Sequence, residues 1–287
     1  MSIDVLQEKI RKTKTPIMLA LEPVVSQLPP AFRDREEHPA AACGAYCRAL
    51  LEGLKDLVPA VRISYACFAI LGQEGLCQLE ETARFASELG YYVVLDWARS
   101  DPAPIAEAAA EALLGGASAY DALTLNPYLG SDAVRPYLPC CKRKKALFVL
   151  VKTPNRSGME LQELITGGRL TYTAVADLVS RLGDGLLGKY AFSQVAASVS
   201  ANSAAALSSL RSKYKELFLL VDGYDQTGGN AKNCANAFDR LGRGAVVCAG
   251  SSVTCAWQEE NTEDFVSAAR KAVDRMKRSL GRYITVL

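Results

Sequence analysis

The chain has 287 residues, 49% of them hydrophobic, and its 33 basic and 31 acidic side chains leave a net charge of +2. This balance argues against a broad basic surface for nucleic acid and against an acidic tail, while the length and apolar content suffice for a full globular core. The single histidine excludes metal centres and acid–base pairs that need two or more histidines.

The N-terminal segment and the cysteines bear on the compartment. Residues 1–16 lack the apolar core of a secretory signal peptide, and no stretch approaches the ~20 apolar residues of a membrane span. The nine cysteines form no C-x-x-C pair, and most lie in Ala-rich apolar surroundings. We therefore expect a cytoplasmic protein with reduced thiols, no metal site and no membrane contact.

Short apolar runs alternate with helical patterns along the whole chain. The runs are almost continuously hydrophobic, which is typical of strands buried on both faces of a parallel sheet. Several end in a polar residue, as do barrel strands that open onto functional loops. The eight runs are residues 17–22, 60–64, 91–96, 121–126, 146–152, 193–199, 217–222 and 244–249.

Helical patterns fill the gaps between these runs. In residues 73–90, apolar side chains recur at spacings of three and four, and Gly90 ends the pattern. Near the C-terminus, Thr262 is predicted to cap a helix that carries Glu263 and Asp264 in its first turn.

Eight strand–helix units without a linker predict an α/β fold, a single (β/α)8 TIM barrel over residues 1–287. An open doubly wound sheet is the alternative, but no glycine-rich dinucleotide fingerprint follows the first strand. Two insertions interrupt the pattern, a polar one at about 25–39 and a long one at about 154–190. Both follow strand ends and are expected at the mouth of the barrel.

Charged residues lie at or near the ends of the first three predicted strands. Glu22 ends the first, Arg62 lies within the second, and Asp96 ends the third. If Arg62 points into the barrel, it needs a carboxylate partner, which Glu22 or Asp96 could supply. Asp96 and Asp101 could form a like-charged pair with raised proton affinity, or Asp101 could cap the following helix.

Glycine-rich segments follow the last two strands, where barrels bind phosphate through backbone N–H groups. The same glycines could simply form turns, and their spacing does not separate the two interpretations. The candidate ligand-binding residues after the fifth, seventh and eighth strands are Thr153, Gly228, Gly229, Gly250, Ser251 and Ser252.

Four segments resemble orotidine-5′-phosphate decarboxylases of the longer bacterial type. They are residues 72–101, 121–141, 146–162 and 217–229, in which the runs TLNPYLGSD and FVLVKT are specific. The resemblance implies a TIM barrel that converts orotidine 5′-phosphate into uridine 5′-phosphate in pyrimidine biosynthesis. It also implies a homodimer with sites at the interface, and no metal or organic cofactor.

The catalytic positions depart from the family's pattern. The family's signature after the third strand is Asp-x-Lys-x-x-Asp, in which the lysine protonates the carbanion left by departing carbon dioxide. Here Asp96 and Asp101 are present, but Ala98 stands at the lysine position. The resemblance also aligns a family lysine with Arg62 and a family aspartate with Glu22. A guanidinium stays protonated at any useful pH, so Arg62 cannot replace the lost acid.

Positions that bind the ligand in the family have changed as well. Pro154 stands at the place of a pyrimidine-binding serine, and it has neither a hydroxyl nor a backbone N–H. Ser251, or Ser252 if the alignment slips by one, replaces a phosphate-binding arginine. These exchanges remove contacts to both ends of the nucleotide.

The loop after the seventh strand is altered in the same way. Thr227 replaces the family's glutamine, with Gln226 one place earlier. Asp222 and Asp225 bring negative charge toward a site that the family uses for a phosphate dianion.

The sequence thus predicts a homodimeric family member whose decarboxylase activity is lost or severely impaired, and which retains an acidic pocket for a nucleotide or another small phosphate ligand. A working decarboxylase with Lys152 as a relocated proton donor is one alternative, and another lyase acting on a phosphate ligand is a second. The resemblance implies that Asp101 serves the partner's pocket. Trp97 is expected to point outward into the helical layer or to plug the mouth.

Overall fold

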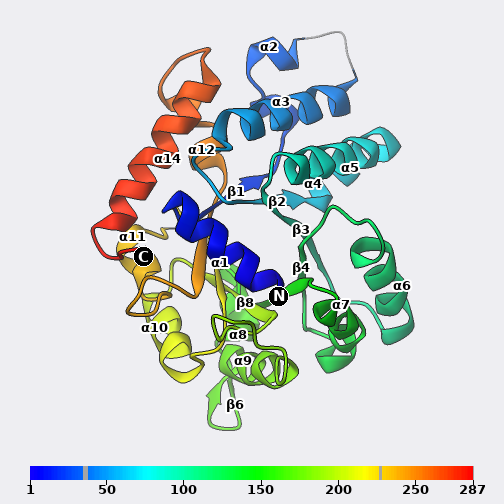
Figure 1. Cartoon of the computed structure of the whole chain (residues 1–287), viewed down its shortest axis with the longest axis vertical. Helices are drawn as coiled ribbons and strands as arrows, with labels where there is room; N and C mark the ends of the chain where they lie inside the picture. The colour runs from blue at the N-terminus through cyan, green and yellow to red at the C-terminus, as the bar shows by residue number, and fades with distance from the viewer. Residues whose placement is uncertain (35–37, 226–227, 287) are drawn as a thin grey trace.

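The computed structural model describes residues 1–34, 38–225 and 228–286, and eight parallel strands in it close into a barrel (Figure 1). Each predicted run overlaps one strand, so the TIM-barrel prediction is confirmed. The strands follow the order β1-β10-β9-β8-β5-β4-β3-β2 around the barrel. Their bounds are β1 Ile17–Leu21, β2 Ala60–Ser64, β3 Tyr92–Arg99, β4 Ala122–Leu125, β5 Ala146–Lys152, β8 Val195–Ser200, β9 Leu219–Asp222 and β10 Ala245–Ala249.

Alternating side chains along each strand build two apolar layers. The inner layer fills the barrel with large side chains such as Tyr92, Phe148 and Phe218, all fully buried. The outer layer, which includes Leu19 and Val61, packs against the surrounding helices. Because both faces are covered, the strands have almost no polar positions until their C-terminal ends.

Helices surround the barrel between consecutive strands (Figure 1). The C-terminal helix begins later than predicted, because Asp264 rather than Thr262 caps it by accepting a hydrogen bond from the Ser267 N–H at 3.0 Å. No described helix is both long and apolar enough to cross a bilayer. The longer helices are α3 Pro39–Leu54, α5 Gly72–Glu88, α6 Ala103–Leu114, α9 Thr171–Leu182, α10 Ala204–Lys213 and α14 Phe265–Gly281, and shorter ones include α4 Tyr65–Ala69, α7 Leu138–Lys142, α11 Ala231–Ala235, α12 Ser251–Thr254 and α13 Ala256–Glu259.

The N-terminal helix α1 (Ser2–Thr13), absent from the sequence-based prediction, closes the end of the barrel at which the strands begin (Figure 1). The Gly244 N–H, just before β10, donates to Gln7 Oε1 at 3.0 Å and holds the helix there. Its fully buried side chains join the inner layer of the barrel; they are Ile3, Leu6 and Ile10. The functional loops are therefore confined to the opposite end.

The segment after β5 builds a small structure of its own before α9. The hairpin in it projects from the barrel (Figure 1). In chain order it consists of the 3-10 turn η4 Arg156–Gly158, the short helix α8 Met159–Gln162, and the hairpin strands β6 Ile165–Thr166 and β7 Arg169–Leu170. The polar stretch after β1 contains η1 Val25–Gln27 and α2 Pro30–Arg33.

Leu6→Ala should lower the free energy of unfolding by about 2–5 kcal/mol, because it removes a fully buried side chain from the barrel interior. Val5→Ala on the same helix is the matched control: Val5 is 42% exposed, and the change should stay below ~0.5 kcal/mol. Urea unfolding followed by circular dichroism measures both values. Equal effects of the two variants would contradict a closing role for α1.

Candidate functional site

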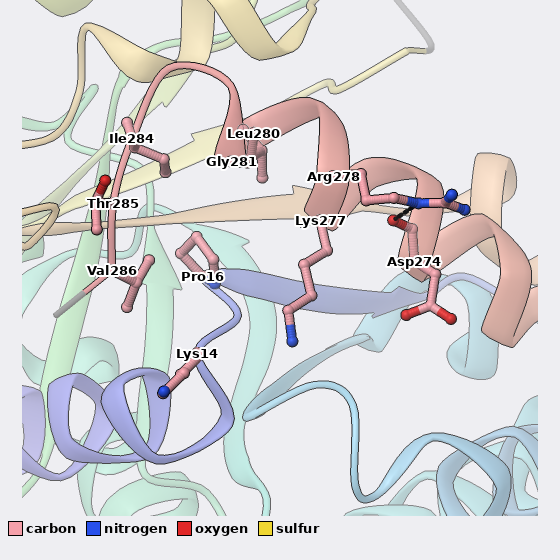
Figure 2. Close-up of a pocket in the computed structure, with 10 residues that line it drawn as sticks. All are labelled: Lys14, Pro16, Asp274, Lys277, Arg278, Leu280, Gly281, Ile284, Thr285 and Val286. Carbon is pink, nitrogen blue, oxygen red and sulfur yellow. Dashed lines mark hydrogen bonds between the residues drawn. The ribbon is translucent and has the colours of Figure 1, made fainter.

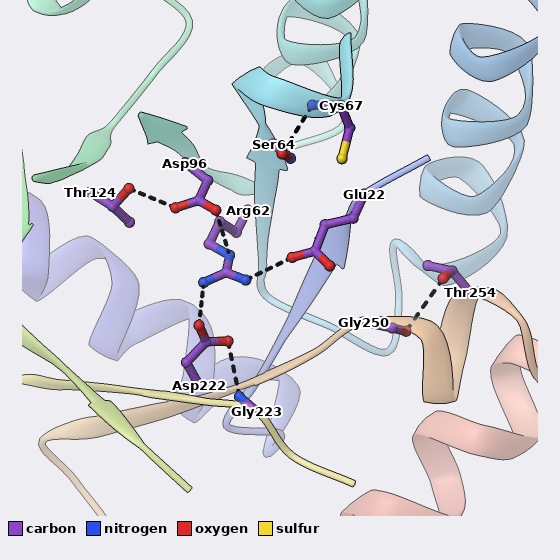
Figure 3. A network of polar contacts seen from close by, with 10 residues as sticks. All are labelled: Glu22, Arg62, Ser64, Cys67, Asp96, Thr124, Asp222, Gly223, Gly250 and Thr254. Carbon is purple, nitrogen blue, oxygen red and sulfur yellow. Dashed lines mark hydrogen bonds and ion pairs between the residues drawn. The ribbon is translucent and has the colours of Figure 1, made fainter. Parts of the chain in front are cut away.

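The site is centred on Arg62, whose guanidinium lies among three carboxylates at the C-terminal end of the barrel (Figure 3). Its Nη2 donates to Glu22 Oε1 at 2.9 Å, and its Nη1 donates to Asp222 Oδ2 at 2.9 Å. The Nε atom lies 3.9 Å from Asp96 Oδ2. Arg62 therefore points into the barrel and pairs with both residues named as its possible partners, and with Asp222 in addition.

The charges in this cluster do not balance. Arg62 is 6% exposed, so its cation could not be buried without carboxylate partners. Burial disfavours the charged guanidinium, but the acidic groups around it outweigh that effect and raise the pKa of Arg62 well above its usual range. Three carboxylates face one cation, which leaves two negative charges in excess. The cluster holds a permanent cation that cannot release a proton, and it is acidic overall.

Ala98 lies just beyond Asp96, in an irregular part of β3. The pairing of β3 with β4 shifts between Leu95 and Arg99, which places Ala98 at a φ of 49°. Its N–H donates to Thr124 Oγ1 at 3.0 Å, and the same hydroxyl donates to Asp96 Oδ1 at 2.6 Å. Thr124 thus supports both the local backbone and the carboxylate, as Figure 3 shows for Asp96.

Trp97 and Asp101 are directed away from the centre. Trp97 packs in the outer layer against Tyr65, with ring centroids 4.7 Å apart, which settles its orientation in favour of the helical layer. The Arg99 guanidinium lies 4.9 Å from the Trp97 ring centroid and donates to Asp101 Oδ1 at 2.8 Å. The helix-cap interpretation of Asp101 is wrong, because α6 has Pro102 at its N-cap and no side-chain cap.

The ligand-binding candidates occupy the remaining rim. The Thr153 N–H donates to Gln162 Oε1 at 2.9 Å, and the Pro154 carbonyl accepts from Asn202 Nδ2 at 3.3 Å. Ser252 Oγ is buried without a hydrogen-bond partner among the described residues. The remaining candidates form the turn at the end of β10, namely Gly250 and Ser251.

The glycines after β9 have a structural role of their own. Gly228 has a φ of 84°, a conformation that favours glycine. A Cβ on Gly229 would lie 2.4 Å from Ala201 Cβ, so only glycine fits at this position. Both facts support the turn interpretation for these two positions. Gln226 and Thr227, also candidates, lie outside the described residues.

The sequence-based prediction did not identify two polar residues as partners within the centre. Asp222 was interpreted as a charge aimed at a phosphate, and Thr124 was not selected. Both positions face inward by strand alternation, since Leu220 and Ala122 two residues earlier belong to the inner layer. This alternation of inward-facing and outward-facing positions was the sequence signal that could have identified both residues.

Cavities flank this centre at the mouth, and others lie at the opposite end of the barrel. A cavity of about 330 Å³ lies beside Asp225, where burial and then the nearby Glu259 raise the pKa of the Asp225 carboxyl. Another of about 470 Å³ lies beside Lys152 at the end of β5. A third, of about 530 Å³, lies at the opposite end of the barrel, and Figure 2 shows its lining residues around Pro16 at the start of β1, most of them from the C-terminal end of α14 and the segment after it.

The arrangement limits the available chemistry. Asp96 has the Arg62 guanidinium and the Thr124 hydroxyl as partners, and no lysine amine among the described residues lies within ion-pair distance of it. No group of three or more His, Cys, Asp or Glu side chains in the described ranges could hold a metal ion. The centre presents a guanidinium and carboxylates, and the described residues offer no ammonium group to donate a proton at Asp96.

The chain is similar to known enzymes over almost its whole length. It is 35% identical over 285 residues to orotidine 5′-phosphate decarboxylase of Rhodopirellula baltica, covering 92% of this chain and 94% of the relative, and 29% identical to that of Clostridium novyi, covering 98% of each. The solved structure of Leishmania donovani OMP decarboxylase superposes with a TM-score of 0.77 at 27% identity, covering 98% of this chain and all of that one. No protein-family model matches the chain.

Arg62→Met should lower the free energy of unfolding at pH 7 by about 3–5 kcal/mol, because it leaves three carboxylates together without a cation. Crowded carboxylates have raised pKa values in the folded state, so protonation relieves the repulsion. The deficit relative to the wild type should shrink as the pH falls from 7 toward 4, which urea unfolding across that range measures. Arg33→Met, which removes an exposed pair with Asp34, should leave unfolding nearly unchanged. A deficit that is constant with pH would contradict the charge argument.

Proposed function

The chain belongs to the orotidine 5′-phosphate decarboxylase family, and we propose that it is a member in which decarboxylation is lost or severely impaired. It acts instead as a cytoplasmic binding or regulatory barrel of one domain, spanning residues 1–287. The observation that carries the proposal is the composition of the centre. Ala98 stands where the family's proton-donating lysine is expected, and the cation beside Asp96 is Arg62, an arginine.

Loss of the proton donor alone predicts a large decrease in the rate of decarboxylation. General acid catalysis typically contributes ~10²- to 10⁴-fold to a rate. Arg62 cannot supply the proton, because its pKa is raised further by the carboxylates that surround it. Ala98 contributes only a methyl group. The carbanion that follows departure of carbon dioxide would have no ammonium group within reach.

Electrostatics weakens the binding of orotidine 5′-phosphate as well. The centre carries an excess of two negative charges, and Ser251 offers no positive charge at the end of β10. One charge about 4 Å from another contributes on the order of 4 kcal/mol at an effective dielectric constant near 20. Near Asp225, this carboxylate and that of Glu259 oppose a phosphate dianion, and Arg275, the cation lining the same cavity, is already paired with Glu260.

The alternative of a relocated acid finds no support in the position of Lys152. Its amine donates to Glu163 Oε1 and lies 5.3 Å from the ring centroid of Tyr172, a residue of the outer layer. The amine is therefore held on the helical side of β5 and not beside Asp96.

A homodimer is part of the proposal, with Asp101 reaching toward the partner's pocket. Large apolar side chains are exposed in the units that follow the neighbouring strands β2, β3 and β4, and a second copy would cover them. Asp101 lies on the same side, after β3. The exposed side chains are Ile70, Ile105, Tyr128 and Leu129.

Purified protein should release no carbon dioxide from orotidine 5′-phosphate above ~10⁻³ of the turnover of an active relative, because both the proton donor and the phosphate contacts are missing. A spectrophotometric assay of conversion to uridine 5′-phosphate measures this. Growth of a decarboxylase-deficient strain without uracil, with this chain as the sole source of activity, would overturn the proposal.

Ala98→Lys alone should not restore turnover, because Pro154 and Ser251 still lack the contacts expected for the base and the phosphate. The same assay on the single variant, with the wild type beside it, tests this. Turnover by the single variant at a normal enzyme rate would show that the binding half of the site is intact.

The chain should sediment as a dimer, and Tyr128→Asp should shift it toward monomer by placing a charge on the apolar surface. Ile165→Asp is the matched control, since Ile165 is as exposed as Tyr128, at 77%, but lies on the projecting hairpin. Sedimentation velocity measures both variants. A wild type that is monomeric at micromolar concentration would contradict the proposed assembly.

A further inference from the structure

We propose that the cavity beside the end of β5 is an anion-binding site that takes the phosphate or carboxylate group of a small ligand through Lys152 and Arg156. The inference goes beyond the loss of decarboxylation. It concerns binding on another side of the mouth and needs no turnover.

The cavity has the size and lining of a small-molecule site. Its volume of about 470 Å³ falls within the ~300–1,000 Å³ range of such sites. Two cations, Lys152 and Arg156, and two side-chain amides, Asn155 and Asn202, line it, with Glu163 as the carboxylate. Cations supply charge for an anion, and amides supply N–H donors that fix its orientation.

Lys152 lines the cavity although the residue is almost fully buried. Its residue is 7% exposed, and an amine buried to this degree requires a partner. The pairing of β5 with β8 shifts between Leu150 and Lys152, and this irregularity accompanies the placement of the amine beside the Tyr172 ring. The described structure gives the amine Glu163 as its ion-pair partner.

Glu163 is a replaceable partner. Its side chain is 42% exposed, whereas that of Lys152 is 8% exposed, so the carboxylate could turn into water without being buried elsewhere. It immediately follows α8, a helix of four residues within the segment after β5. An anion from solution could take its place and keep the buried amine paired, so Glu163 behaves as a competing internal anion.

Arg156 provides the second cation. No carboxylate of the described residues lies within ion-pair distance of its guanidinium, which leaves that group available to a ligand. The other side of the mouth is acidic, with an excess of two negative charges around Arg62 and with Asp225 at the end of β9. The anionic end of a ligand is thereby directed to the β5 side.

Calorimetric titration of the full chain with inorganic phosphate, and separately with malonate, tests the site and distinguishes the two anions. Glu163→Gln should tighten binding about tenfold, because it removes the competing charge but keeps the shape. Lys152→Met should abolish binding, and Arg156→Ala should weaken it about tenfold. Lys215→Met, which removes an exposed positive charge on another part of the surface, is the control and should bind like the wild type.

A comparison of uridine 5′-phosphate with uridine extends the test to a nucleotide. Loss of nucleotide binding in both Lys152→Met and Arg156→Ala supports the site. If Lys152→Met fails to fold, the Arg156→Ala variant, which changes an exposed residue, tests the site by itself. Affinity for phosphate and malonate that is unchanged in Glu163→Gln and in Arg156→Ala would overturn the inference. Turnover of orotidine 5′-phosphate would refute the proposed loss of activity but would leave this result standing.

Discussion

The ion pairs of Arg62 are the interaction on which the mouth of this barrel depends. The guanidinium of Arg62, within β2, joins the ends of β1, β3 and β9: it donates hydrogen bonds to Glu22 and Asp222 and forms an ion pair with Asp96. A lysine ammonium is a compact point charge and would not span the same partners. The arginine holds three carboxylates together, and because a guanidinium stays protonated it cannot itself donate a proton there.

Much of this architecture could be predicted from residue patterns. Continuous apolar runs located the barrel strands, and polar residues at their ends located the mouth, because parallel strands expose polar groups mainly there. The partners of Arg62 were only partly predictable. Glu22 and Asp96 followed from the need to neutralise a buried cation, but Asp222, at the end of the seventh run, was interpreted as a charge near the phosphate rather than as a partner of Arg62.

Other features depended on long-range packing that local patterns do not contain. The irregular end of β3 extends that strand to Arg99, and it places Trp97 in the outer layer and Ala98 at a positive φ. The helix α1 was missed because the N-terminus was considered only as a targeting segment. Its apolar side chains Ile3, Leu6 and Ile10 can be recognised as core residues only once the barrel is known to be closed, because they pack into its inner layer.

The closure by α1 has a consequence for how the chain reaches its native state. The helix precedes all the barrel strands in the chain, yet its hydrogen-bond partners Gln194 and Gly244 come from the last third of the residues. The amphipathic helix α1 is therefore synthesised before the strands that complete its docking surface. Docking of α1 therefore depends on contacts that span most of the sequence, and long-range contacts of this kind slow folding.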